Sequence, residues 1–358
     1  MAMVDIIECL KKMVALRASD LHIKAPTGPI YRIDGYLCKC EDGEITAEDV
    51  EAAFSSITSE KQKAEFYKNL ELDFSYSIPG VARYRINVES QRGTLSLAIR
   101  MIPFQVPTIE ELQLPDILKD LIMKPRGLIV VSGPTGSGKS TTLAAMIDHV
   151  NNHGNRSIIT IEDPIEYVFA DNNCVILQRE LGVDTRSFPD ALRSALRHDP
   201  DVIVVGEMRD YDTVSTVIAA AETGHLVLGT LHTIDAPQAV DRLVDLFPPS
   251  QQRQVRVQFS QIIEAVVCQT LLPKACGHDR IAAFEIMLVN DAIRNQIREG
   301  RTFELHNTMQ MNMLNGMMLL DIDLARLVNE DIVKKDVAVT KCSNRERLER
   351  LVKQKSVF

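Results

Sequence analysis

The stretch Gly133-Pro134-Thr135-Gly136-Ser137-Gly138-Lys139-Ser140-Thr141 follows the apolar run Leu128–Ser132 and precedes a helical segment. It matches the pattern GxxxxGK[ST], a phosphate-binding loop between a strand and a helix. The glycines allow successive backbone N–H groups to turn around phosphate oxygens, and the helix N-terminus adds its positive dipole end. We therefore expect a nucleotide site in which Lys139 reaches the β- and γ-phosphates and the Ser140 hydroxyl binds Mg²⁺.

The composition is that of an ordinary globular chain. Its 358 residues are 45% apolar and 25% charged, which predicts two or three domains and excludes global disorder. No apolar run approaches the roughly 18 residues of a membrane span, and the N-terminus shows no secretory signal. The seven cysteines form no Cys-x-x-Cys pair, so we expect a reduced, cytoplasmic compartment and no zinc site. The net charge of −9 argues against a nucleic-acid partner.

The pattern of predicted strands and helices changes near residue 102. Residues 1–102 mix β-like runs with a helical stretch at 47–67, which predicts an α+β domain. Residues 103–112 contain two prolines and predict a linker. Within it, a Thr-x-Glu-Glu start at Thr108 predicts a short amphipathic helix.

The rest of the chain predicts a second, α/β domain. From 127 to about 232, short apolar runs alternate with helical segments, which is typical of a parallel sheet buried on both faces. We place this second domain at residues 113–285. Residues 286–358 predict a helical C-terminal subdomain. The expected strands are Leu128–Ser132, Ile158–Ile161, Val202–Val205 and Leu226–Leu231.

Acidic residues end two more of these strands, and open α/β sheets bind ligands beyond such strand ends. Glu162 and Asp163 follow the second run, where they either support a metal or water network or form an acidic turn. Glu207 follows the third run, and Gly206 takes the usual position of the Walker B aspartate. Glu207 is placed to orient or deprotonate the attacking water, and a carboxylate near a helix N-terminus is the other interpretation.

Two histidines, His225 and His232, flank the fourth run. A single histidine is more often a structural residue. A pair beside three other polar strand ends favours a role in sensing the γ-phosphate or coupling it to subunit contacts. The two ends of one strand lie too far apart to share a metal ion.

Four motifs combine in this chain: a Walker A at 133–141, an acidic box at 161–167, an atypical Walker B at 201–210 and a histidine box at 221–233. Together they resemble the type II/IV secretion ATPase superfamily, and within it the PilT-type pilus retraction ATPases of twitching motility. Further matches lie at 18–23, 71–76, 83–87, 91–93 and 240–243. The segment 292–299 resembles the AIRNLIRE marker of retraction ATPases, with Gln296 where leucine is usual.

The resemblance implies a homohexameric ring whose subunits join an N-terminal PAS-like domain to a RecA-like P-loop core. ATP and Mg²⁺ would bind between subunits, and Arg83, Arg85 and Arg100 match the N-terminal arginine fingers of the family. Solvated strand residues are the other interpretation of these arginines. The implied function is ATP-driven pilus retraction by a cytoplasmic motor, peripheral at the inner face of the cytoplasmic membrane. Its implied partners are the inner-membrane platform protein of the pilus machine and a paralogous retraction ATPase.

Three other functions stay open. An assembly or secretion ATPase of the same superfamily typically has an extra N-terminal domain and a tetracysteine zinc motif, and the lack of both here favours retraction. A nucleic-acid translocase would share the RecA-like core. A non-motor paralogue would bind nucleotide as a regulatory subunit, but the intact Lys139, Ser140 and Glu207 argue against it.

Overall fold

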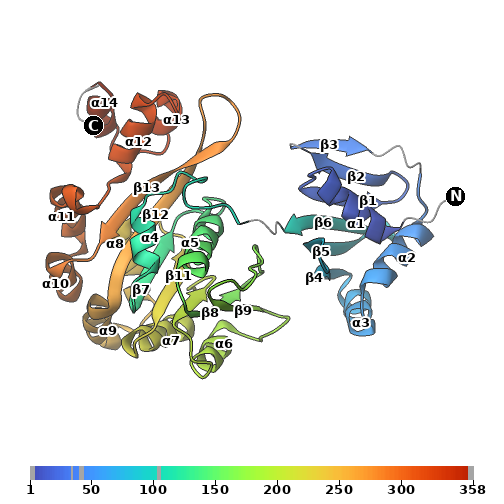
Figure 1. Cartoon of the computed structure of the whole chain (residues 1–358), viewed down its shortest axis with the longest axis horizontal. Helices are drawn as coiled ribbons and strands as arrows, with labels where there is room; N and C mark the ends of the chain where they lie inside the picture. The colour runs from blue at the N-terminus through green and yellow to red at the C-terminus, as the bar shows by residue number, and fades with distance from the viewer. Residues whose placement is uncertain (1–4, 34, 40–43, 103–105, 354–358) are drawn as a thin grey trace. The chain divides into compact units, whose positions relative to one another are not determined.

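The computed structural model describes residues 5–33, 35–39, 44–102 and 106–353. The chain divides into two compact units (Figure 1). The first comprises residues up to 105 together with the short segment 166–168, and the second comprises the other residues from 106 onward. The predicted linker begins with residues 103–105, which lie outside the described residues. No helix in the described ranges is both long enough and apolar enough to cross a membrane.

The first unit is a six-stranded sheet of antiparallel strand pairs in the order β3-β2-β1-β6-β5-β4. Its core consists of apolar side chains from the helices and from one face of the sheet. The elements are α1 (Ile6–Ala15), β1 (Asp20–Lys24), β2 (Gly28–Ile33), β3 (Tyr36–Lys39), α2 (Ala47–Ile57), α3 (Glu60–Asn69), β4 (Glu71–Ile78), β5 (Ala82–Gln91) and β6 (Thr94–Ile102). The α+β class is confirmed, and the PAS-like detail stays a prediction.

The predicted helix at 47–67 is two helices, α2 and α3. The first begins as expected, because Thr46 and Asp49 exchange the hydrogen bonds of a capping box. A second capping box, between Ser59 and Gln62, starts α3. Ser59 satisfies a backbone N–H of the new helix, so the chain stops one helix at Ile57 and starts another.

The second unit is a seven-stranded sheet in the order β13-β12-β7-β11-β10-β8-β9, in which only the β12–β13 pair is antiparallel. Its strands are β7 (Gly127–Ser132), β8 (Ser157–Glu162), β9 (Val175–Glu180), β10 (Val202–Val205), β11 (Leu226–Leu231), β12 (Ile263–Pro273) and β13 (Arg280–Leu288). The four predicted strands are confirmed. Strand β9 and the β12–β13 hairpin were not expected.

Helices cover both faces of this sheet, which explains the near-continuous apolar runs of its strands. Along β7, Ile129 and Val131 pack with α4 and α5, whereas Leu128 and Val130 pack with α6 to α9. The covering helices are α4 (Ile117–Ile122), α5 (Lys139–His153), α6 (Phe188–Ala195), α7 (Tyr211–Glu222), α8 (Ala236–Asp245) and α9 (Pro249–Ile262). Burial on both faces is the pattern of a parallel α/β sheet, so the fold class is confirmed.

The helix predicted to start at Thr108 does not form. Thr108 and Glu111 exchange the two hydrogen bonds of a capping box, but the segment is only a turn. Pro115 follows, and the residue before a proline is disfavoured in the helical conformation. The helix α4 therefore begins later, at Ile117.

Helices follow the last strand, and two buried carboxylates join them to the sheet. Asp323 on α12 accepts a hydrogen bond from the Phe284 N–H of β13 at 2.9 Å. Glu285 on β13 accepts hydrogen bonds from the Ala236 N–H at 2.9 Å and from His306 Nε2 on α11 at 3.3 Å. These helices are α10 (Asp291–Glu299), α11 (Leu305–Met311), α12 (Leu320–Asn329), α13 (Lys335–Val339) and α14 (Arg345–Lys353).

The His306–Glu285 contact predicts a pH-dependent contribution to stability. The hydrogen bond to Glu285 raises the pKa of His306, and burial opposes that rise. Because the folded-state pKa exceeds the unfolded value of about 6.5, the contribution is complete below that pH and is lost as pH rises through the folded pKa. We expect His306→Gln to lower the free energy of unfolding by at most about 1 kcal/mol at acidic pH, and less at alkaline pH, since the ring is partly exposed.

Urea unfolding at about pH 6 and about pH 8.5 measures this difference. His278→Gln, at an exposed turn of the β12–β13 hairpin, is the control and should show no such dependence. Equal destabilisation by His306→Gln at both pH values would contradict the assignment.

Candidate nucleotide site

The predicted phosphate-binding loop connects β7 to α5 as expected. Its backbone turns through Gly136 and Gly138, whose φ angles of +77° and +90° lie in the left-handed region, which favours glycine. The Ser137 N–H donates to the Pro134 carbonyl at 3.1 Å and closes the turn. Gly138 is the N-cap of α5, and no side chain caps this helix with a hydrogen bond. The N–H groups of its first turn are therefore available to an incoming anion.

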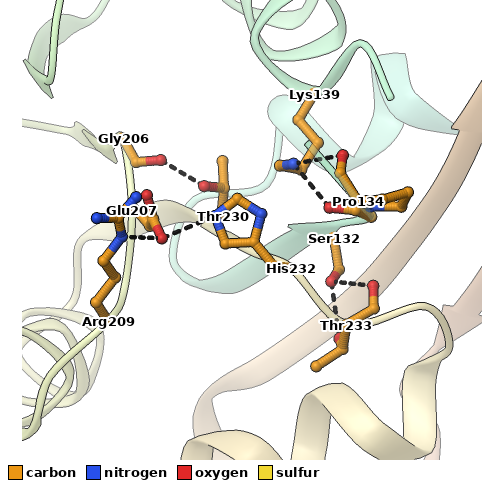
Figure 2. A network of polar contacts seen from close by, with 10 residues as sticks. Ser132, Pro134, Lys139, Gly206, Glu207, Arg209, Thr230, His232 and Thr233 are labelled. Carbon is orange, nitrogen blue, oxygen red and sulfur yellow. Dashed lines mark hydrogen bonds and ion pairs between the residues drawn. The ribbon is translucent and has the colours of Figure 1, made fainter. Parts of the chain in front are cut away.

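Lys139 lies over this loop. Its Nζ donates hydrogen bonds to the carbonyl oxygens of Gly133, at 2.7 Å, and Pro134, at 3.1 Å (Figure 2). Ser140 follows it in the first turn of α5. The ammonium group and the hydroxyl therefore stand beside the loop that would hold the phosphates.

The parallel register brings the ends of the neighbouring strands to the same edge of the sheet. Leu231 of β11 pairs with Ser132 of β7, and Val205 of β10 pairs with Gly229 of β11. Glu207, which follows β10, and His232, which follows β11, consequently lie together. Ser132 Oγ donates to the Thr233 carbonyl at 2.7 Å, which ties the start of the loop to the segment after His232 (Figure 2).

Glu207 is held by two donors at one carboxylate oxygen. His232 Nε2 lies 2.8 Å from Oε1, and Arg209 Nε contacts the same oxygen (Figure 2). Partial burial raises the pKa of Glu207, but the hydrogen bond from Arg209 and the charges of His232 and Arg209 outweigh it and hold the pKa below its ordinary value. Glu207 is therefore an ionised carboxylate at neutral pH, and within the described residues its Oε2 has no hydrogen-bond donor.

Comparison of the sequence with known proteins identifies the family of the chain. The sequence matches the model described as type II/IV secretion system protein over residues 73–352. The chain belongs to the type II/IV secretion system protein family.

Relatives within the family include two pilus ATPases of Pseudomonas aeruginosa. The chain is 45% identical over 334 residues to the type IV pilus retraction ATPase PilT, which covers 93% of this chain and 97% of that protein. It is 37% identical over 344 residues to the type IV pilus ATPase PilU, covering 96% of this chain and 90% of that one. A crystal structure of the pilus retraction motor PilT with bound ADP has a TM-score of 0.90 and 45% identity, over 97% of this chain and 99% of that chain. The chain is thus a PilT-type ATPase, as the sequence motifs predicted.

Gly206 departs from a general Walker B because the strands approach closely there. Its N–H donates to the Ile161 carbonyl at 2.7 Å. A Cβ at Gly206 would lie 3.1 Å from the Ile161 oxygen and 3.2 Å from the Glu162 Cα. A side chain at this position would press on the backbone of the neighbouring strand, and the acidic residue at this strand end is the next one, Glu207.

Arg209 was not predicted as a site residue, although its hydrogen bond is the largest of the effects that lower the pKa of Glu207. One feature of the sequence could have indicated this contact. Arg209 follows Glu207 by two residues just after a strand, and alternate side chains of an extended chain point the same way. The sequence alone does not show that the chain stays extended over these residues.

The two acidic-box residues lie differently. Glu162 accepts hydrogen bonds from Thr160 Oγ1 at 2.6 Å and Gln178 Nε2 at 3.1 Å. Asp163 is exposed and adds to the electrostatic field at Arg209. Glu162 ends β8 and Asp163 follows it, at the edge that carries the phosphate-binding loop, and their roles stay predictions.

The structure does not bring His225 to this cluster. It precedes β11, whereas His232 follows it, so the six-residue strand separates the two by about 20 Å. His225 Nδ1 lies 2.9 Å from the Ala220 carbonyl and 3.2 Å from Thr223 Oγ1. These contacts fix the ring at the end of α7.

The three predicted finger arginines share one face of the N-terminal sheet. Arg83 and Arg85 alternate with buried residues along β5, and Arg85 pairs with Arg100 of β6. Arg100 Nε donates to Asp20 Oδ1 at 2.9 Å, and Arg85 Nε lies 3.8 Å from Asp73 Oδ1. These carboxylates offset the repulsion that two like charges opposite each other in a sheet would produce.

The contact at Gly206 predicts a stability defect. We expect Gly206→Ala to lower the free energy of unfolding by about 1–3 kcal/mol, because its methyl group meets backbone atoms of a buried strand that cannot move independently. Urea unfolding measures the loss, and ATP turnover should fall with it because Glu207 is the next residue. Unchanged stability and turnover would show that the two strands can separate without cost.

Proposed function

We propose that this chain powers type IV pilus retraction by hydrolysing ATP at the loop 133–141, as one subunit of a homohexameric ring. The observation that carries the proposal is the ionised Glu207, held by His232 at the sheet edge that also bears the phosphate-binding loop. The match to PilT over nearly the whole of both chains supports retraction as the process that the ATPase drives.

The chemistry assigned to each residue follows from its position. The backbone N–H groups of residues 135–141 and the Lys139 ammonium bind the phosphates, and the Ser140 hydroxyl is a hard oxygen donor suited to Mg²⁺. When bound, Mg²⁺ would neutralise charge on the phosphates. Glu207 orients the attacking water through Oε2, the oxygen that His232 and Arg209 leave open. Its lowered pKa makes it a weak base, which suffices because a loose phosphoryl-transfer transition state depends mainly on positioning.

His232 is suited to report the state of the nucleotide. It contacts Glu207, and the adjacent Thr233 is bonded to Ser132 at the start of the loop. A change at the γ-phosphate would therefore reach His232 from two sides. We assign Glu162 and Asp163 to the metal or water network, and His225 to the coupling of this site to subunit contacts.

The arginines of the N-terminal unit would complete the site of a neighbouring subunit. Arg83, Arg85 and Arg100 lie on one face, where Arg100 is 73% exposed and able to leave Asp20. Positive charge supplied in trans is a common device for stabilising the transition state of phosphoryl transfer.

The proposed setting is the cytoplasmic face of the inner membrane. There the ring would act as a peripheral protein on the platform protein of the pilus machine. A PilU-like paralogue is a second proposed partner, by analogy with the two related ATPases of Pseudomonas aeruginosa.

Replacing Glu207 with glutamine tests the hydrolytic role. We expect Glu207→Gln to retain ATP binding and to lower kcat at least about 100-fold, because the amide cannot replace the carboxylate that aligns the water. Nucleotide titration and phosphate release measure the two properties. Glu346→Gln, at an exposed position of α14, is the control. Turnover by Glu207→Gln at the wild-type rate would contradict the role of Glu207 in aligning the attacking water.

Mixed rings test the arginines. We expect Arg85→Ala or Arg100→Ala to be inactive alone and to regain activity when mixed with Lys139→Ala, because some interfaces then combine an intact loop with an intact arginine. Mixing Lys139→Ala with Glu207→Gln is the control, since both lesions lie in the same unit and no interface is restored. Arginine mixtures that stay as inactive as this control would contradict a role in trans. Phosphate release against mixing ratio is the measurement.

A further inference from the structure

Gln269 is a buried amide of β12 that lies beside the phosphate-binding loop. The β7–β12 ladder ends at the pair Ser132 and Cys268. At that point β7 turns into the loop, whereas β12 continues with Gln269, which is 4% exposed. Neither a motif nor a charge marks this residue in the sequence.

The Gln269 side chain holds the loop through one short hydrogen bond. Its Nε2 donates to the Ser137 carbonyl at 2.6 Å. Two loop glycines also approach this residue. A Cβ at Gly133 would lie 2.3 Å from the Gln269 carbonyl oxygen, and a Cβ at Gly138 would lie 3.0 Å from Nε2. The loop is thus packed against Gln269 at both of its ends.

This hydrogen bond orients a peptide unit of the loop. In a planar trans peptide the C=O and the N–H point in opposite directions. Because the Ser137 carbonyl points to Gln269, the N–H of Gly138, which belongs to the same peptide unit, points away from β12. Gly138 is the N-cap of α5, where N–H groups bind phosphate.

Among the residues that the structure describes, the Gln269 side chain makes no other hydrogen bond that would explain its burial. Within the described part of the chain, Gln269 Oε1 and the nearby Ser137 Oγ are buried without a hydrogen-bond partner. Buried side-chain polar atoms are usually paired. Within the described ranges, the Ser137 carbonyl is therefore the only hydrogen-bond partner of the Gln269 side chain. An amide buried for purely structural reasons would be expected to bond through both its oxygen and its nitrogen.

We propose that Gln269 is a positioning residue for the phosphate-binding loop. By holding the Ser137 carbonyl, it keeps the Gly138 N–H directed at the phosphates of a bound nucleotide. The inference rests on the proposed function, because it assumes that nucleotide binds at this loop. It adds a residue from outside the sequence motif, and it assigns a function to the strand next to β7.

Gln269→Met tests the inference, because methionine has a similar length and no donor. We expect the Kd for ADP and the KM for ATP to rise about 10-fold, since one hydrogen bond contributes up to about that factor. We expect kcat to change by less than about twofold, because the loop binds substrate and transition state alike. Gln252→Met is the matched control, since Gln252 also donates its amide to a backbone carbonyl, that of Phe247 at 3.1 Å.

Thermal unfolding separates positioning from a merely structural role. Bound ADP raises Tm according to its affinity. A positioning role predicts that Gln269→Met has a smaller ADP-induced rise in Tm than the wild type, whereas Gln252→Met keeps the full rise. A lower Tm without nucleotide, but with the ADP-induced rise and the KM unchanged, would overturn the proposal.

A second variant tests the inference if Gln269→Met folds poorly. Gln269→Glu preserves shape and polarity but replaces the donor with a carboxylate, so its ADP affinity should fall at least as far. Wild-type ADP affinity in this variant would overturn the inference alone. If the wild-type protein and Lys139→Ala bind ADP equally weakly, the proposed function itself fails. The two failures are therefore distinguishable.

Discussion

The parallel register of β7, β11 and β10 is the constraint on which the site depends. It places the residues that follow all three strands at one edge of the sheet, where the loop, His232 and Glu207 meet. Alternate side chains of each strand pack with different sets of helices, so a shift of one residue would exchange the side chains that contact each set. Helices cover both faces of the sheet. The packing of the apolar core therefore fixes the distances between the loop, His232 and Glu207, which lie outside that core.

Charge balance at Glu207 is the second requirement. A partly buried carboxylate loses hydration, and this cost is offset only by donors and opposite charges. Arg209 and His232 supply both at the same oxygen. The arrangement keeps the carboxylate ionised while leaving its other oxygen for water. A strong base is not needed when the main task is to align a nucleophile with a phosphorus atom.

The sequence was sufficient for the parts of the structure that depend on local pattern. The phosphate-binding loop, the four buried strands and the start of a helix at residue 47 follow from spacing and residue type. The parts it missed depend on distant contacts. Strand β9 lies at a sheet edge with an irregular burial pattern, and Arg209 acquires its partner only from the path of the chain after β10. Thr108 shows the opposite error, because its capping bonds form but Pro115 prevents the helix that they usually start.

Strand β12 joins the nucleotide site to the helices that follow the sheet. Gln269 pairs with Phe284 of β13, whose N–H is bound by the buried Asp323 of α12. One residue further along β13, Glu285 binds both the N-terminus of α8 and His306 of α11. Buried polar contacts of this kind are costly to break, since each would leave an unsatisfied group. The helices after β13 are therefore fixed to the sheet. A displacement of the phosphate-binding loop that moves β12 would also move β13 and the helices bonded to it.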